Sequence, residues 1–132
     1  MSLELQMLGY SALLGFAQII LASHSASFQR GYGWTAGSRE DTVAPLTGAA
    51  NRFARALANF LETFPLFAAL VLAAHVASRE GTLTSWGVQL YFWARLAYVP
   101  LYGVRVVRSL VWNVAAAGIL LVAVALLWPG SS

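Results

Sequence analysis

The chain has 132 residues, of which 59% are hydrophobic and only 10% are charged, whereas soluble domains carry roughly 25% charged residues. A soluble domain of this size has too little interior to bury so much apolar surface, and disordered chains are polar and rich in charge. The eight basic residues behind the net charge of +3 are too scattered for a nucleic-acid-binding surface. The absence of cysteine excludes disulfides and thiolate metal sites.

Four apolar segments predict an all-α membrane protein, a four-helix up-down bundle formed by one domain, residues 1–132. A helix needs about 20 residues to cross the hydrocarbon core, and each segment reaches that length. The long connection, residues 27–51, is rich in glycine, whereas the other links are short, so consecutive helices are expected to be antiparallel. The predicted helices cover about residues 3–25, 52–78, 82–104 and 108–128.

Basic residues near the helix ends predict the orientation in the membrane. The link between the second and third predicted helices holds only Arg79, and neither end of the chain holds any lysine or arginine. The positive-inside rule therefore places the first and third links in the cytoplasm and both termini outside. The basic residues of those two links are Arg30, Arg39, Arg52, Arg105 and Arg108.

Polar residues interrupt the second apolar segment at helical spacing. Arg55, Asn59 and Glu62 are four and three residues apart, so they lie on one stripe of the helix, with Arg52 one turn earlier. Each charge costs about 2.5–3.5 kcal/mol at the centre of an isolated inserted helix, so the stripe must face the bundle interior or a wet cavity. One interpretation is a structural clamp, in which these side chains only hold the helices together.

The third apolar segment carries a complementary set of side chains on one face, which an interfacial aromatic belt explains only in part. The arginines of this face and of the second helix outnumber Glu62, the carboxylate of the second helix. A site between the two helices therefore suits a small anionic molecule that bears carboxylates and an amine. No cluster of histidines and carboxylates predicts a metal site. The residues of this face are Tyr91, Arg95, Tyr98, Tyr102 and Arg105.

The run NRFARALANFLETFPLF, residues 51–67, resembles the second-helix signature of the MAPEG family, the membrane-associated proteins of eicosanoid and glutathione metabolism. The core of that signature is Arg-x-x-x-Asn-x-x-Glu followed by Phe-Pro-Leu-Phe. Arg95, Tyr98 and Tyr102 resemble the third-helix pattern of the family. The resemblance covers nearly the whole chain and implies a bacterial-type member in a bacterial inner membrane.

The resemblance implies a homotrimer that binds glutathione between subunits as a co-substrate, without a metal, and transfers it to lipophilic molecules arriving from the membrane lipids, or uses it to reduce peroxides. Arg108, which Ser109 follows, would stabilise the glutathione thiolate, and Arg105 is the competitor for that role. Arg30 is a looser candidate for a ligand carboxylate. The other glutathione-binding residues implied are Arg52, Arg55, Asn59, Glu62, Arg95, Tyr98 and Tyr102.

An alternative function remains open at this point, namely a non-catalytic membrane binding or structural protein of the same family. It is favoured by two departures from the active members: Thr63 stands where some members have Tyr, and the spacing from Tyr102 to Arg108 is shorter. A small drug exporter is disfavoured because such exporters need an unneutralised carboxylate, whereas Glu62 is outnumbered by arginines.

Overall fold

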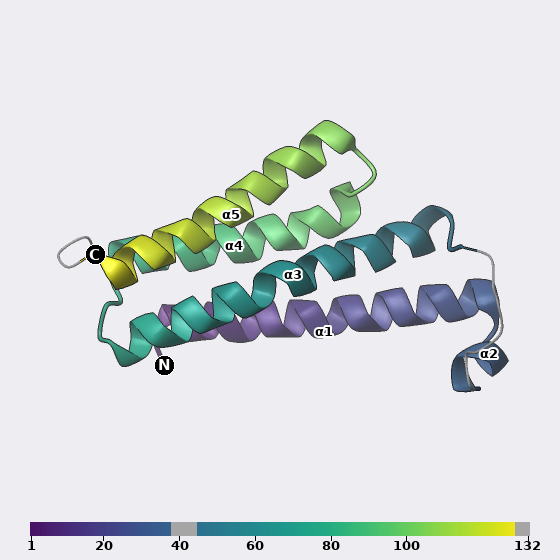
Figure 1. Ribbon diagram of the computed structural model, residues 1–132, viewed down its shortest axis with the longest axis horizontal. Helices are drawn as coiled ribbons and strands as arrows, with labels where there is room; N and C mark the ends of the chain where they lie inside the picture. Colours follow the sequence, from purple (N-terminus) through teal and green to yellow (C-terminus); the bar gives the residue numbers. More distant parts are fainter. Residues whose placement is uncertain (38–44, 129–132) are drawn as a thin grey trace.

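The computed structural model describes residues 1–37 and 45–128, which form an elongated bundle of four long helices with one short helix at an end (Figure 1). Arg39, which was counted with the basic residues of the first link, lies outside the described residues. The helices are α1 (Leu3–Arg30), α2 (Tyr32–Ala36), α3 (Gly48–Val76), α4 (Thr82–Leu101) and α5 (Arg105–Leu127).

Two of the helix bounds follow directly from local chemistry. Ser2 caps α1, since its Oγ accepts a hydrogen bond from the backbone N–H of Leu5 at 3.2 Å, which satisfies one of the free donors of the first turn. At the other end, Gly31 has φ of 96°, a conformation that only glycine adopts readily. The first helix therefore runs to Arg30, further than the sequence predicted, and the expected loop of residues 27–51 contains α2.

The link between α4 and α5 corrects one prediction. The sequence pattern extended the third helix to residue 104 and placed Arg105 on its polar face. Instead α4 ends at Leu101, after Pro100, which cannot donate a backbone hydrogen bond to the preceding turn. Arg105 begins α5, and Arg108 lies within the first turns of α5, not in a link. The two arginines therefore belong to a different helix from Arg95.

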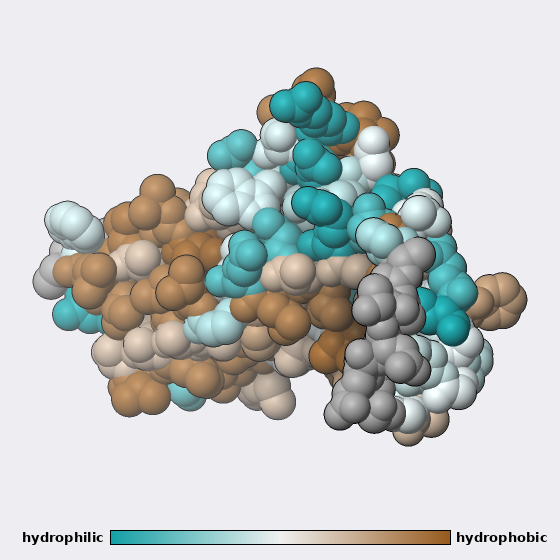
Figure 2. Space-filling model, turned by 45° about the vertical axis from the view of Figure 1, so that its right-hand side comes forward, coloured by the Kyte–Doolittle hydropathy of each residue, from teal (hydrophilic) through white to brown (hydrophobic). Residues whose placement is uncertain are grey.

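The helices alternate in direction, so both termini lie at one end of the bundle (Figure 1). At the other end lie α2, the start of α3 and the 102–104 link; we call it the basic end, after Arg30, Arg52, Arg105 and Arg108. On the face shown in Figure 2, hydrophilic side chains gather toward the basic end and apolar ones cover the opposite end. The up-down arrangement and the common end of the first and third links are confirmed.

Three of the long helices, α1, α3 and α5, are long and apolar enough to cross a membrane, and the chain is an integral membrane protein. The fourth, α4, has the length of a crossing at 20 residues but is less apolar. It contacts α1, α3 and α5, whereas α1 and α5 do not contact each other among the described residues. The side of α4 that packs against these helices is buried and includes Arg95, so the one charged residue of α4 is kept away from lipid.

The closest packing in the bundle joins α4 to α5 at two glycines. A Cβ added to Gly87 would lie 2.6 Å from the carbonyl oxygen of Gly118, and a Cβ on Gly118 would lie 2.6 Å from that of Gly87. Such small residues let membrane helices approach backbone to backbone. Beside this contact, the rings of Phe67 and Tyr91 stack with centroids 3.9 Å apart, which ties α3 to the same interior.

Candidate functional site

Arg95 is the largest fully buried side chain of the bundle, with 1% of its surface exposed. Its Nη1 donates to Oδ1 of Asn59 at 2.7 Å and its Nη2 to the carbonyl of Ala56 at 3.4 Å, so α4 is fastened to α3. The guanidinium carbon lies 4.2 Å from the ring centroid of Tyr98 and 5.5 Å from that of Phe60, within the range of cation–π attraction. All these partners are neutral, and no carboxylate in the described part of the chain forms an ion pair with Arg95.

Tyr102, at the C-terminal end of α4, gathers arginines from two further helices. The Nε of Arg55 on α3 donates to its hydroxyl at 3.3 Å. The guanidinium carbon of Arg108 on α5 lies 4.7 Å from its ring centroid, and Nη1 of Arg108 is 3.5 Å from its backbone carbonyl. The ring of Tyr98 packs edge-on against Tyr102, with centroids 5.5 Å apart. Three helices thus contribute guanidinium groups around two phenol rings.

Two cavities open beside this cluster, and Asn59 lines both of them. The α3 cavity, of about 300 Å³, is lined by Arg55, Ala58, Asn59, Glu62 and Tyr102. The α5 cavity, of about 280 Å³, is lined by Asn59, Tyr98, Arg108, Ser109, Trp112 and Asn113.

Glu62 lies at the midpoint of α3 with its side chain exposed. It forms no hydrogen bond or ion pair with any residue of 1–37 or 45–128. An unpaired carboxylate on the outer surface of a membrane-crossing helix is expensive, and such groups face a protein interior or a wet cavity instead. This face of α3 is therefore a candidate for contact with a ligand or with a second chain.

The structure brings most of the predicted site residues together and separates three from the rest. Arg30 lies over the ring of Trp34 on α2, at 5.2 Å from its centroid, Arg52 lies beside Gly103, and Arg105 is exposed at the start of α5. None of the three lines either cavity. The residues that do line them are Arg55, Asn59, Glu62, Tyr98, Tyr102, Arg108 and Ser109, with Arg95 buried behind Asn59.

Trp112 and Asn113 line the α5 cavity, and the sequence interpretation missed both. They follow Arg108 and Ser109 by four residues, the spacing that stacks side chains on one face of a helix. The Nδ2 of Asn113 donates to the carbonyl of Ser109 at 2.8 Å, so its side-chain oxygen remains free to accept. The spacing is present in the sequence, but the segment after Arg108 carries no charge and reads as uniformly apolar, which hides this polar face of α5.

Fold and site together define an integral membrane helical bundle whose polar and cationic side chains gather between α3, α4 and α5. The chain belongs to the MAPEG family, because the model of that family matches residues 7–128, and this confirms the resemblance read from the second and third helices. MAPEG proteins are membrane enzymes that generally depend on glutathione. No curated protein and no solved structure matches the chain.

Proposed function

We propose that the protein is a membrane-bound glutathione transferase or peroxidase that acts on lipophilic electrophiles and binds glutathione at the interfaces of a homotrimer, near the basic end. The observation that carries this proposal is the pair of cavities that meet at Asn59, with surplus guanidinium on their walls. The positive-inside rule places the basic end on the cytoplasmic side of the membrane.

The chemistry of glutathione suits these walls. The tripeptide carries two carboxylates, one ammonium group and one thiol. Arg55 and Arg108 offer N–H donors to carboxylates, and Glu62 offers an unpaired carboxylate to the ammonium group. Arg95, which is buried behind Asn59, adds positive charge near both cavities and holds Asn59 in place by a hydrogen bond. The residues present therefore fit the co-substrate, with Tyr98 and Tyr102 as the phenol groups between the arginines.

We assign the activation of the thiol to Arg108. A free thiol has a pKa near 8.5, and a neighbouring cation favours its thiolate form. A downward shift of one pKa unit corresponds to about 1.4 kcal/mol. Arg108 is held against the ring of Tyr102 and lines the α5 cavity beside Ser109. The thiol proton passes to water as the thiolate forms. The thiolate would then attack an electrophilic carbon of a substrate that enters from the bilayer, and the leaving group, chloride in a chloronitrobenzene, departs as the C–S bond forms.

In a homotrimer, a neighbouring subunit would cover the exposed face of α3. The exposed Glu62 and Arg55 would then face a neighbouring subunit instead of lipid, and glutathione would lie between the two chains. Mass measurement of the purified protein in a mild detergent is expected to give three chains in a particle. A particle that contains one chain only would contradict this part of the proposal.

The catalytic role of Arg108 is tested against Arg105 as a matched control, since both arginines start α5 but only Arg108 lines a cavity. Arg108→Leu is expected to lower kcat for conjugation of glutathione to a chloronitrobenzene by about 100-fold, as for the loss of one charge-stabilising donor. The KM for glutathione should change only a few-fold, because the lost interaction favours the transition state over the ground state. Arg105→Leu should keep most of the activity.

Ultraviolet absorbance of the thiolate separates the enzyme from the non-catalytic alternative. The parent protein should produce the thiolate band when glutathione is added at neutral pH, and Arg108→Leu should not. Activity lost in Arg105→Leu and kept in Arg108→Leu would transfer the role to Arg105. Glutathione that binds without any thiolate band or turnover would establish the non-catalytic binding protein instead.

A further inference from the structure

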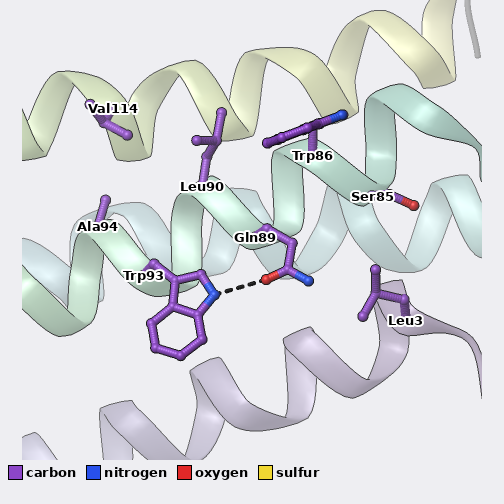
Figure 3. Close-up of a pocket in the computed structure, with 8 residues that line it drawn as sticks. All are labelled: Leu3, Ser85, Trp86, Gln89, Leu90, Trp93, Ala94 and Val114. Atoms are coloured by element: carbon purple, nitrogen blue, oxygen red, sulfur yellow. Dashed lines mark hydrogen bonds between the residues drawn. The ribbon is translucent and has the colours of Figure 1, made fainter.

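A separate groove of about 500 Å³ lies on the side of α4 that faces away from α3 (Figure 3). Because α1 and α5 both contact α4 but not each other in the described part of the chain, they form its two walls and α4 forms its floor. Leu3 projects from α1 and Val114 lies on α5. None of the residues around the two glutathione cavities lines this groove.

The groove is apolar over most of its length. Leu90 and Ala94 form part of the floor, and the indole rings of Trp86 and Trp93 stand beside it, with 62% and 58% of their surfaces exposed. Its volume lies within the range of small-molecule sites, about 300–1,000 Å³. Since this face of α4 is turned to the outside of a membrane protein, a hydrocarbon chain is the natural occupant of the apolar part.

Three polar side chains of the groove, Ser85, Gln89 and Trp93, lie on one row of α4, and the indole of Trp86 adds a further N–H group beside that row. Trp93 Nε1 donates to Oε1 of Gln89 at 2.8 Å (Figure 3). An indole is a donor only, so it occupies the amide oxygen and leaves the Nε2 of Gln89 with two N–H groups. These N–H groups have no acceptor among residues 1–37 and 45–128. Within a membrane such donors need a partner.

Ser85, one turn before Gln89, offers the opposite chemistry. Its hydroxyl donates to Oε1 of Glu4 at 3.1 Å, so its oxygen is left to accept. Glu4 is 5% exposed, and its carboxyl group lies directly behind Ser85. The polar end of the groove therefore presents donors from Gln89 and an acceptor from Ser85, and a buried carboxyl group there disfavours an anionic ligand.

We propose that this groove binds a neutral single-chain acyl ester with a free hydroxyl, of the monoacylglycerol class. The ester carbonyl accepts from Nε2 of Gln89, the hydroxyl of the head donates to Ser85, and the acyl chain runs past Trp93 toward Ala94. Gln89 lies about 10 Å along α4 from its first residue, at 1.5 Å per residue, so the head of the ligand would lie toward the N-terminal end of α4. This binding does not depend on glutathione.

The experiment uses the full chain in detergent and follows quenching of its tryptophan fluorescence by three probes with the same dibrominated stearoyl chain. The probes are the monoacylglycerol, the methyl ester and the free fatty acid. The monoacylglycerol should half-saturate quenching at a concentration at least about fivefold below that of either other probe, since only it satisfies both Gln89 and Ser85.

Three variants locate the site. Gln89→Met, which removes the donors, should weaken monoacylglycerol binding by about three- to tenfold, as for one hydrogen bond. Val114→Phe should weaken it at least as much by filling the groove. Leu120→Phe is the matched control, because Leu120 is also exposed on α5 but does not line the groove, and should leave binding unchanged. Each variant is accepted only if it elutes and unfolds like the parent.

Equal quenching by all three probes, unaffected by Gln89→Met, would mean ordinary contact with detergent-dissolved lipid and would overturn the proposal. Tighter binding of the fatty acid would overturn the assignment of a neutral head. Saturation that is lost when copies associate into a larger particle would show that a second chain covers the groove, which also overturns it. If Val114→Phe fails to fold, the result for Gln89→Met decides alone.

Discussion

The α4–α5 contact and the basic end of the bundle differ in packing: the first is tight and the second is open. At the contact, the backbones touch at Gly87 and Gly118, with no space for even one added carbon. At the basic end, long cationic side chains surround two cavities, and Glu62 and Arg55 are exposed on a helix that crosses the membrane. The first region makes its contacts within one chain, whereas in the second Glu62 has no partner among residues 1–37 and 45–128.

This difference separates residues that hold the protomer together from residues that await a ligand or a second chain. A change at the α4–α5 contact should lower the free energy of unfolding with or without glutathione. A change on the exposed stripe of α3 should leave that free energy almost unaltered and act on binding. Arg95 and Asn59 lie between these extremes, because they join two helices and also line or support the site.

The largest effect on stability is expected for Gly118→Val. The added Cβ would meet the carbonyl oxygen of Gly87 at 2.6 Å and the backbone nitrogen of Tyr91 at 2.9 Å, and backbone atoms cannot rotate away as a side chain can. Such overpacking should lower the free energy of unfolding by more than about 3 kcal/mol. Denaturant unfolding in detergent measures it.

Gly9→Val serves as the control, because a Cβ at Gly9 has no atom within 4 Å. A Gly118→Val protein as stable as Gly9→Val would show that α4 and α5 can separate at little cost, and the comparison between the two regions would fail.

An intermediate effect is expected for Asn59→Leu. This change removes the acceptor of the 2.7 Å hydrogen bond from Arg95, and among the described residues the guanidinium keeps only the longer hydrogen bond to the carbonyl of Ala56, beside its contacts with the rings of Tyr98 and Phe60. Loss of a hydrogen bond to a charged group should lower the free energy of unfolding by about 2–3 kcal/mol, and glutathione affinity should fall as well. Thermal unfolding and calorimetric titration measure the two effects.

Asn113→Leu is the matched control, since Asn113 is exposed and, within residues 1–37 and 45–128, its side chain bonds only to Ser109 of its own helix. Its unfolding free energy should stay within about 0.5 kcal/mol of the parent. An equal loss of stability in both variants would mean that the Arg95–Asn59 contact has no special role.

The smallest effect on stability is expected for Glu62→Gln, because Glu62 has no partner among the described residues of its own chain. Without ligand, the free energy of unfolding should change by less than about 0.5 kcal/mol. Glutathione at 100 times its Kd should stabilise the parent by about 2.7 kcal/mol and stabilise Glu62→Gln much less, since the ammonium group of the ligand loses its carboxylate. Thermal unfolding with and without glutathione gives both values.

Glu80→Gln provides the contrast at the other end of the bundle. Glu80 bonds to Ser2 and His75, so that variant should lose stability but keep the full response to glutathione. A response that falls in Glu80→Gln and persists in Glu62→Gln would place the ligand elsewhere.

The sequence predicted the fold class and much of the candidate site because both depend on spacing along one helix. Arg55, Asn59 and Glu62 repeat at helical intervals, and the helix around them is continuous over the whole run, so their common stripe could be derived without a structure. Arg105 was assigned to the wrong helix for the converse reason: an angle extrapolated along the third segment has no meaning once that helix ends at Leu101.

Contacts between helices could not be predicted from spacing along a single helix. The meeting of Gly87 with Gly118 depends on the relative height of two helices, which no periodicity within either one determines. The donation from Arg95 to Asn59 likewise required the register of α3 against α4. Both residues were correctly assigned to the polar faces, but their direct hydrogen bond is a finding of the structure.

The neutral surroundings of Arg95 have a consequence for the response to ionic strength. Salt ions screen charges in water over a Debye length of about 8 Å at physiological concentration, but they screen buried charges far less. Arg95 therefore maintains a positive potential beneath the cavities that added salt does not remove, whereas the attraction of the exposed Arg55 weakens as salt rises. The affinity for an anion should fall at first as salt rises and then level off. The affinity that remains at high salt includes the contribution of the buried Arg95, which salt does not screen.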